Sequence, residues 1–600
     1  MREYSTPLSV TVPVVGSLTD DIVANGEQFP DAVALSRRTT PGAHWTDVTA
    51  AQFLHEVRLV AKGLVAAGVE PGDRVALLSK TRYEWTLVDY AIWYAGAVTV
   101  PVYETSSPEQ VGWILTDSGA RSVVVETPRH GALVGGLGDE VHLDHVWMLD
   151  DPSGTGAVAE LRALGETVDD ATLEERRAAV QPDDAATIIY TSGTTGRPKG
   201  CVLTHGNFMF ELEVATTELR EIFEIEDAST LLFLPLAHVF ARVIQVGAIK
   251  KRVRLGHSSD IRRLVDDFGE FRPTFVLAVP RVFEKLFNTA SQRAASEGRG
   301  RVFDRATDVA IAYSQALDRG RVGPFLRLQH TLLDRLVYGR LRGALGGSCQ
   351  YAVSGGAPLG ERLGHFYRGI GMPVLEGYGL TETTAAITVN LPDALRVGSV
   401  GRPLGGTTIR VGDDGELLAR GGQVLHRYWQ DEAATREVLT PDGWLRTGDL
   451  GEIDAEGFVR ITGRKKEILV TAGGKNVAPS VLEDRLRAHH LVSQCMVVGD
   501  GKPYIAALVT IDVEAFEPWA EQHGKRGPLA ALTEDPDLLA EIQSAVDEAN
   551  KAVSQAESIR RFAVLPVDWT EEGGQLTPSL KLRRNVVMRE FRRDVESLYD

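Results

Sequence analysis

Cysteine is scarce in this sequence of 600 residues, which contains Cys201, Cys349 and Cys495 and no others. Their odd number and wide separation exclude a disulfide framework and match no metal-ligand spacing, so they indicate a reducing compartment. Long hydrophobic runs are also missing: no stretch of about 18 residues is apolar and uncharged, which excludes a transmembrane helix. The first 16 residues lack the basic-then-apolar order of a signal peptide. We therefore expect a cytoplasmic protein.

Basic residues are fewer than acidic residues in this sequence. The chain has 64 lysine and arginine residues against 82 aspartate and glutamate residues, which gives a net charge of −18. This balance argues against nucleic acid as the main partner, although it leaves room for a local basic patch. Hydrophobic residues make up 43% of the chain and charged residues 24%, as in an ordinary globular protein. Because 600 residues exceed what one core organises, we expect at least two domains.

Glycine, serine and threonine are concentrated between residues 190 and 200, directly after an apolar run at 185–189 that predicts a buried strand. Glycine lets backbone N–H groups converge on an anion, hydroxyls add donors, and lysine adds a positive charge. Pro198 stands where the common nucleotide-binding loop requires its second glycine, so this is a different loop. A flexible surface loop is the alternative, but the preceding strand favours polyphosphate binding. The candidate ligands are Thr191, Ser192, Gly193, Thr194, Thr195, Gly196 and Lys199.

Helix and strand patterns alternate between residues 45 and 126, which predicts α/β layers with a parallel sheet and right-handed crossovers. From residue 398 short strands and turns predict a β-rich subdomain. Charges cluster at 463–467 and suggest an exposed linker, so we divide the chain into a large domain at 1–462 and a small C-terminal α/β domain at 463–600. The small domain is predicted to contain helices at 481–489 and 536–560 and strands at 495–498 and 505–511.

Two further strands run into glycine-rich turns, one at Gly355, Gly356 and Ala357 and the other at Glu376, Gly377, Tyr378 and Gly379. The ring of Tyr378 is flanked by glycines and could stack on a base. The second turn continues into Thr381 and Glu382, which place a hydroxyl beside a carboxylate. Glu382 could hold Mg²⁺, a hard cation that prefers oxygen ligands and accompanies phosphate.

His238 and Phe240 follow an apolar strand that breaks at Pro235. A lone histidine beside an apolar run is usually a core residue whose ring nitrogens are hydrogen-bonded within the protein. Ligands of open α/β sheets gather beyond the carboxyl ends of the strands, however, and this place favours a pocket role for His238 and Phe240.

Residues 281–345 are helical by pattern and include an apolar stripe interspersed with arginines. A membrane-surface helix and an amphipathic core helix with snorkelling arginines both fit this pattern. We favour the core helix, because ordinary surface helices share the spacing, and leave a peripheral contact with the inner membrane face open. The stripe consists of Phe325, Leu328, Leu332, Leu333 and Leu336, and the arginines are Arg327, Arg335, Arg340 and Arg342.

Together these motifs resemble the adenylate-forming superfamily of acyl-CoA synthetases, peptide adenylation domains and luciferases, from about residue 20 to the end of the chain. Within it the chain is most similar to the long-chain fatty acyl-CoA synthetases. The resemblance to that branch rests in part on the motif Leu-Pro-Leu-Ala-His-Val-Phe at 234–240. One departure is that the terminal lysine follows Leu580, where many relatives have glycine, but the form Leu-Thr-Pro-x-x-Lys at 576–581 is similar to the long-chain branch. The other matching motifs are 190–200 (phosphate loop), 279–285, 354–358 and 376–382 (adenine and AMP), 447–449 (ribose), 463–467 (hinge) and 576–584 (catalytic lysine).

The resemblance implies an enzyme that joins a fatty carboxylate to AMP from ATP, releases pyrophosphate, and then transfers the acyl group to coenzyme A. It implies catalytic roles for Lys581, Thr381 and Glu382, with Mg²⁺ on Glu382. It assigns ribose binding to Asp449 with Arg464, and implies that the small domain rotates about Lys466. It also places Gly473, Gly474 and Lys475 on the coenzyme A side and His238 and Phe240 at the acyl pocket.

Two alternatives remain. An acyl-AMP ligase would hand its product to a carrier protein, but the regular phosphate loop with Gly196 and Lys199 favours coenzyme A. A non-catalytic nucleotide or lipid sensor would have lost Lys581, Glu382 or Asp449, and all three are present. The sequence predicts no oligomeric state.

Overall fold

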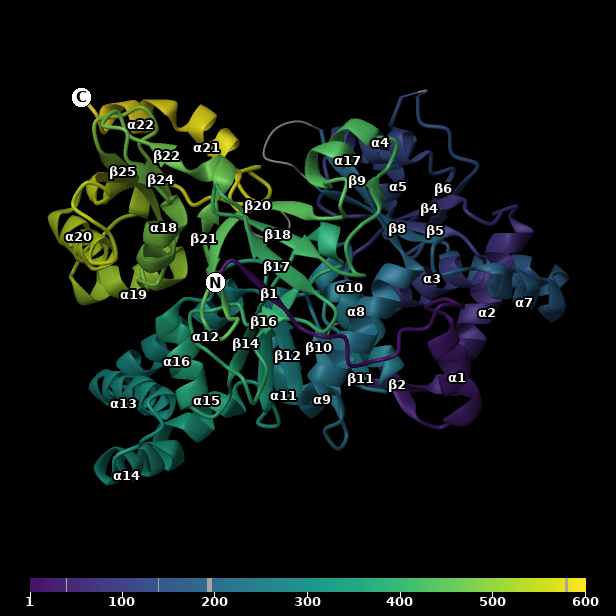
Figure 1. Cartoon of the computed structure of the whole chain (residues 1–600), viewed down its shortest axis with the longest axis horizontal. Coiled ribbons are helices and arrows are strands. Elements are labelled where there is room, and N and C mark those ends of the chain that lie inside the picture. Colours follow the sequence, from purple (N-terminus) through teal and green to yellow (C-terminus); the bar gives the residue numbers. More distant parts are fainter. Residues whose placement is uncertain (39, 41, 139, 192–196, 578–580) are drawn as a thin grey trace.

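The computed structural model describes residues 1–600 except 39, 41, 139, 192–196 and 578–580. Figure 1 shows one large body, coloured purple to green, with a smaller unit in yellow-green and yellow beside it. The N-terminus lies near the middle of the large body, whereas the C-terminus lies at the outer edge of the small unit.

One sheet of the large body confirms the predicted parallel α/β layer. Its strands β8, β5, β4, β6 and β7 pair in parallel, and β9 returns antiparallel to β8. The helix α3 (Tyr83–Tyr94) is buried along almost its whole length, so its aromatic residues pack in the core. In spatial order the sheet contains β19 (Arg427–Tyr428), β9 (Lys199–Thr204), β8 (Ala185–Thr191), β5 (Val98–Val102), β4 (Arg74–Leu78), β6 (Ser122–Val125) and β7 (His145–Met148).

A second sheet positions the site. Its inner strands β14, β13, β12, β10, β11 and β2 pair in parallel, so their carboxyl ends share one edge. His238, Gly355 and Gly379 follow three of these strands and are brought to that edge. In spatial order the sheet contains β16 (Arg402–Pro403), β15 (Thr388–Val389), β14 (Val374–Tyr378), β13 (Tyr351–Ser354), β12 (Phe275–Ala278), β10 (Ser229–Leu232), β11 (Arg254–His257), β2 (Val33–Arg37) and β3 (Thr46–Thr49).

An antiparallel sheet forms the predicted β-rich region. Asp449 on β20 stands directly opposite Arg464, the last residue of β21. The edge strand β1 comes from the extreme N-terminus, which the sequence did not predict, and it pairs with β17. In spatial order the sheet contains β1 (Glu3–Ser5), β17 (Thr408–Val411), β18 (Glu416–Arg420), β20 (Leu445–Ile453) and β21 (Val459–Arg464).

The small unit has its own core, built from a buried cluster drawn entirely from residues 477–564. The predicted helix at 536–560 is wrong beyond Asn550, where α20 ends. The Asn550 carboxamide bonds the backbone N and O of Ile559 and closes a turn into a strand. The elements are α18 (Pro479–Arg487), β24 (Val492–Val498), β25 (Ile505–Ile511), α19 (Val513–Gln522), α20 (Pro536–Asn550) and β26 (Ile559–Val564).

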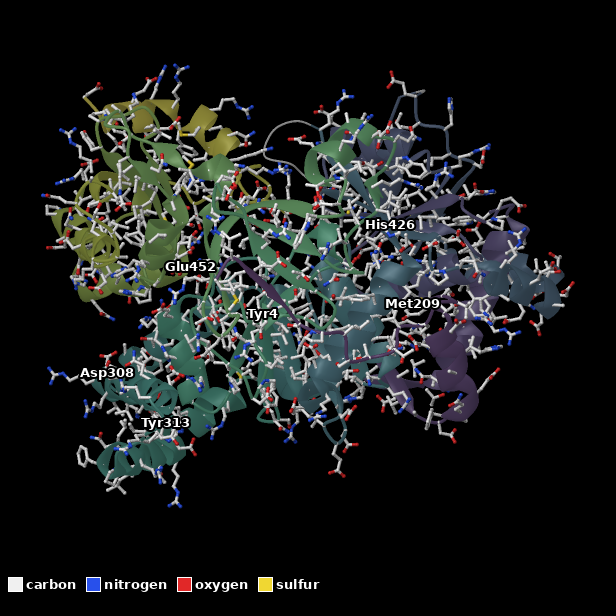
Figure 2. All side chains as sticks on the ribbon, viewed as in Figure 1. Tyr4, Met209, Asp308, Tyr313, His426 and Glu452 are labelled. Carbon is white, nitrogen blue, oxygen red and sulfur yellow. The ribbon has the colours of Figure 1, made fainter. Side chains whose placement is uncertain are left out.

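The predicted helical region after residue 280 is confirmed, but the expected core role of its apolar stripe is wrong. Phe325, Leu328, Leu332 and Leu336 are exposed, and Leu333 packs against the core. Apolar spacing identifies one face of a helix but not what that face meets. Figure 2 labels Asp308 and Tyr313 on α13 in this region. The elements are α12 (Pro280–Ser296), α13 (Gly300–Asp318), α14 (Pro324–Leu333), the π-helical turn η3 (Asp334–Tyr338) and α15 (Gly339–Gly343).

Candidate active site

A cleft of about 2570 Å³ lies between the large body and the small unit. Residues from both sides line it, so strands and loops far apart in the sequence meet there. The predicted site residues that line the cleft are Gly356, Ala357, Glu376, Gly377, Tyr378, Gly379, Asp449, Arg464, Lys466 and Lys581.

Asp449 lines the cleft and has two side-chain hydrogen-bond partners. Its carboxylate is buried and accepts hydrogen bonds from Tyr378 Oη at 2.7 Å and from Arg464 Nε at 2.9 Å. Burial and the neighbouring carboxylate raise the pKa of Tyr378 well above its usual value, so the phenol stays protonated and donates. The carboxylate is thereby fixed in one orientation in the wall of the cleft.

The turn after β14 depends on glycine. A Cβ on Gly379 would lie 1.6 Å from the carbonyl oxygen of Ala385, so any larger residue would displace this backbone. On the same strand Glu376 is buried, and Oε2 accepts from the backbone N–H of Leu359 at 3.1 Å. Burial raises the pKa of Glu376 to about 7, with the Leu359 hydrogen bond opposing the rise.

Lys581 enters the cleft from the small unit. Leu576 and Leu582 form an antiparallel bridge around it, and its backbone N–H donates to Thr577 Oγ1 at 3.0 Å. The side chain keeps access to water, but protein atoms surround it within the cleft. This burial, together with the charge of Arg464, lowers its pKa, while Asp449 acts in the opposite direction.

Glu382 and His238 also lie within electrostatic range of the Lys581 ammonium. Glu382 opposes the fall in the lysine pKa. Burial lowers the pKa of His238 to about 3, and the positive charge of Lys581 contributes to that fall. His238 is therefore neutral, and its Nδ1 accepts from the backbone N–H of Phe240 at the start of α10 (Val239–Lys250). Four segments of the large body thus converge on one lysine of the small unit.

Tyr428 is a site residue that the sequence analysis missed. Its hydroxyl donates to Glu382 Oε1 at 2.7 Å, and Lys199 Nζ lies 5.6 Å from the centre of its ring. β19 carries Tyr428 alongside β9, which begins at Lys199. Lys199 also lies 4.0 Å from Glu437. No local signal marks Tyr428, because it is distant in sequence from both residues that it contacts.

The structure describes only some of the residues that were predicted to form the phosphate loop. Thr191 ends β8 and Lys199 begins β9, while Ser192, Gly193, Thr194, Thr195 and Gly196 lie outside the described residues. Arg197 and Pro198, which directly precede β9, line the cleft. Thr381 and Glu382 belong to the 3-10 turn η4 (Thr381–Thr383) immediately after the lining residue Leu380.

The predicted acyl-pocket pair lies beside the cleft without lining it. A Cβ on Gly355 would meet the Phe240 ring at 3.1 Å, so this ring packs directly beneath the turn that follows β13. His238 and Phe240 are both half-buried.

The predicted coenzyme A-side residues lie outside the lining of the cleft. Gly473, Gly474 and Lys475 form the tip of a hairpin between β22 (Leu469–Val470) and β23 (Asn476–Val477). Lys475 Nζ lies 3.5 Å from Glu557 of the same unit. Lys466 is exposed in the 3-10 turn η5 (Lys465–Glu467), which connects the β-rich sheet to this hairpin.

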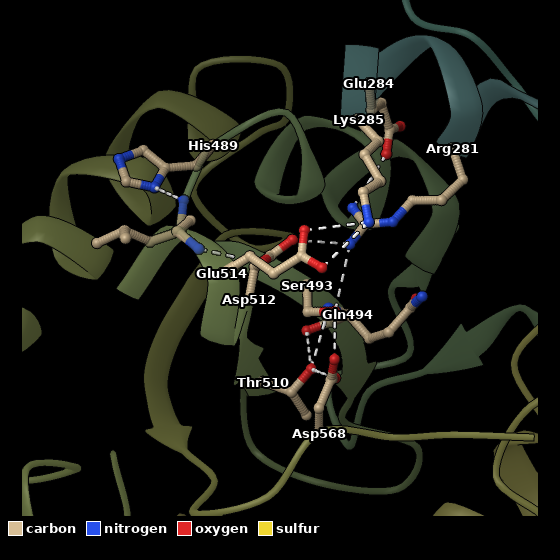
Figure 3. A network of polar contacts seen from close by, with 12 residues as sticks. Arg281, Glu284, Lys285, His489, Ser493, Gln494, Thr510, Asp512, Glu514 and Asp568 are labelled. Carbon is tan, nitrogen blue, oxygen red and sulfur yellow. Dashed lines mark hydrogen bonds and ion pairs between the residues drawn. The ribbon is translucent and has the colours of Figure 1, made fainter. Parts of the chain in front are cut away.

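Polar contacts join the small unit to α12 of the large body (Figure 3). Arg281 lies 3.4 Å from Asp512 and 3.3 Å from Ser493 Oγ, and Lys285 lies 3.1 Å from Glu514. We call these contacts the α12 latch. They join the two parts of the protein in the orientation in which Lys581 lies near Asp449 and Glu382.

Comparison with known proteins identifies relatives for the whole chain. Residues 22–429 match the family model of the AMP-binding enzyme, and residues 466–600 match the AMP-binding enzyme C-terminal domain. The chain is 50% identical to the long-chain-fatty-acid–CoA ligase FadD15 of Mycobacterium bovis, and the match covers 100% of both chains. Among solved structures, the adenylation domain of a carboxylate reductase from Mycobacterium chelonae superposes with a TM-score of 0.72 at 24% identity, covering 97% of this chain and 91% of that one. The anthranilate CoA ligase AuaEII in complex with anthranoyl-AMP gives a TM-score of 0.71 at 19% identity, with 98% and 99% covered.

Proposed function

Because this chain belongs to the family of AMP-binding enzymes, we propose that it is a long-chain fatty acid–CoA ligase that forms AMP. A carboxylate resists nucleophiles because of its negative charge, and conversion to an acyl-adenylate supplies AMP as a leaving group. The fatty carboxylate oxygen bonds to the α-phosphorus of ATP, and the bond from that phosphorus to pyrophosphate breaks. The coenzyme A thiol then attacks the acyl carbon, loses its proton, and releases AMP.

The convergence on Lys581 is the observation that carries this proposal. Adenylate formation demands that negative charges on the carboxylate and the phosphates be neutralised and aligned. Lys581 faces Asp449, Arg464 and Glu382 across the cleft, at the carboxyl ends of parallel strands. In the proposed reaction its ammonium bridges the carboxylate and the α-phosphate.

The nucleotide is proposed to lie between the glycine turns and Asp449. Gly355, Gly356 and Ala357 would border the adenine, with the ring of Tyr378 available for stacking. Asp449 would accept the ribose hydroxyls, because a carboxylate held by Tyr378 and Arg464 still offers free lone pairs. Loop residues 191–199 would hold the β- and γ-phosphates, with Lys199 as their cationic partner.

Glu382 is the residue that fits Mg²⁺. One of its oxygens accepts from Tyr428, which leaves the other for a metal, and Mg²⁺ commonly binds one carboxylate together with substrate phosphates and water. The ion would neutralise phosphate charge there. Tyr428 orients the carboxylate, and Thr381 would contribute a hydroxyl to the phosphates.

The second half-reaction is proposed to follow rotation of residues 463–600 about Lys466. The exposed turn that holds Lys466 supports this pivot. Rotation would withdraw Lys581 and bring Gly473, Gly474 and Lys475 to the cleft, where glycine lets the narrow pantetheine arm approach the backbone. His238 and Phe240 would border the acyl chain, since a neutral histidine and a phenyl ring tolerate apolar contact.

Pyrophosphate release with a panel of carboxylic acids tests the proposal. Palmitate should support release, acetate should support far less, and coenzyme A should convert the adenylate to a thioester. Equal rates with acetate and palmitate would contradict a long-chain site. Transfer to a carrier-protein phosphopantetheine but not to free coenzyme A would instead identify an acyl-AMP ligase.

A further inference from the structure

The helix α14 and the turns after it expose an apolar face on the outer edge of the large body, at the lower left of Figure 1. Successive members are three, four and four residues apart, which places them on one side of the helical segment. Surfaces that expose several large apolar side chains together commonly mark an interaction site. The exposed fractions are 71% for Phe325, 68% for Leu328, 59% for Leu332 and 55% for Leu336.

Arginines surround this apolar face. Residues 319–343 contain six arginines and one acidic residue, Asp334, whereas the whole chain has a net charge of −18. Asp334 is paired with Arg342 at 2.7 Å. Within the part of the chain that the structure describes, the five exposed arginines form no ion pair, and three of them lie three or four residues from an apolar member. The exposed arginines are Arg319, Arg321, Arg327, Arg335 and Arg340.

The opposite side of α14 is fixed to the protein. The ring of His330 stacks on Tyr313 of α13 at 3.8 Å, and His330 Nε2 donates to the carbonyl oxygen of Gly369 at 2.6 Å. α13 in turn contributes Ile311 and Gln315 to the cleft. The exposed face is therefore held on a rigid support, one helix away from the site.

We propose that this face docks on a lipid surface with anionic headgroups. The apolar side chains would enter the headgroup boundary while the flanking arginines pair with lipid phosphates, as in interfacial amphipathic helices. None of the described helices has the length and apolarity to cross a bilayer, so the contact is peripheral. A second copy of this chain fits poorly, because a two-fold contact would face one arginine rim with the other. The proposal goes beyond acyl activation and does not depend on it.

Flotation of the full chain with vesicles tests this docking. The wild type should float with phosphatidylcholine vesicles that contain phosphatidylglycerol, and added salt or pure phosphatidylcholine should weaken binding. The double variant Leu328→Glu with Leu332→Glu should lower the vesicle affinity at least about tenfold, because it places charge in the headgroup boundary. The double variant Arg335→Glu with Arg340→Glu should remove most of the salt dependence. Val567→Glu is the matched control, since Val567 is 54% exposed on the small unit, and it should float like the wild type.

Each outcome decides the question. Failure of the wild type to float with anionic vesicles, or unchanged flotation of the leucine variant, would overturn the proposal. A concentration-dependent dimer that the leucine variant abolishes, without vesicle binding, would also overturn it. Pyrophosphate release with octanoate and no vesicles should be unchanged in the α14 variants. Absence of this pyrophosphate release in the wild type would contradict acyl activation and would leave the result of the flotation experiment unaffected.

Discussion

We expect the α12 latch to affect the ratio of the rates of the two half-reactions. Asp512→Asn removes the charge that faces Arg281 but leaves the side-chain oxygen that accepts from Ala515 N–H at the start of α19. The helix cap is therefore kept, and the change acts on the contact between the small unit and the large body. We expect pyrophosphate release to slow relative to thioester formation from supplied acyl-AMP.

The size of the effect follows from the burial of the pair. The Arg281 and Asp512 side chains are 24% and 26% exposed, so this pair is worth more than the 0–1 kcal/mol or so of a surface ion pair, and about 1–2 kcal/mol is reasonable. Because about 1.4 kcal/mol is a tenfold change in an equilibrium, the ratio of the two half-reaction rates should change roughly five- to thirtyfold.

Glu514→Gln supplies the control. Lys285 and Glu514 are 57% and 73% exposed, so their pair contributes little and the rate ratio should change less than about threefold. Pyrophosphate release and thioester formation are measured separately on each variant. Equal slowing of both half-reactions by Asp512→Asn, or the same effect from Glu514→Gln, would refute the assignment of the latch.

Other residues give independent tests. Lys581→Ala should lower adenylate formation at least about a hundredfold while thioester formation from supplied acyl-AMP is largely kept, and equal loss of both steps would refute alternation of the small domain. Tyr428→Phe removes the hydrogen bond that orients Glu382, so the Mg²⁺ concentration for half-maximal pyrophosphate release should rise several-fold; an unchanged Mg²⁺ titration would refute that role. Burial raises the pKa of Glu376 from 4.5 to about 7, so the folded state binds the proton more tightly and loses this stability as pH rises through that interval. Glu376→Gln stays neutral, so its melting temperature relative to the wild type should rise between about pH 5 and pH 8, and a pH-independent difference would contradict the shift.

Elements with a strong local pattern were predicted closely. β25 has the bounds expected from its apolar run at 505–511, because a strand buried on both faces is apolar throughout. The glycine turns were found for a similar reason, since glycine is required where backbone must pass close to backbone, as at Gly379.

Features that depend on distant partners were not predictable in this way. Tyr428 carries no motif, and it becomes recognisable only when β19 pairs with β9 and brings it to Lys199 and Glu382. The apolar stripe on α14 was predicted with the correct spacing, but its predicted burial in the core was wrong. The stacking of His330 on Tyr313 fixes which side of the helix faces the protein. Contacts between residues that are far apart in the sequence decide both the place of Tyr428 and the exposure of the stripe.

The charges around Lys581 would allow a weak latch to control the proposed rotation of the small unit. The protein groups alone disfavour the charged lysine, because burial and Arg464 outweigh Asp449 and Glu382 and lower its pKa. ATP phosphates would reverse that balance and add attraction to the contacts that Arg281 makes with the small unit. Departure of pyrophosphate removes part of that attraction, and the small unit is then held chiefly by a latch of a few kcal/mol at most. In the proposed mechanism, the substrate that the reaction consumes would thus stabilise the orientation that forms the adenylate, so completion of the first half-reaction would itself favour the second.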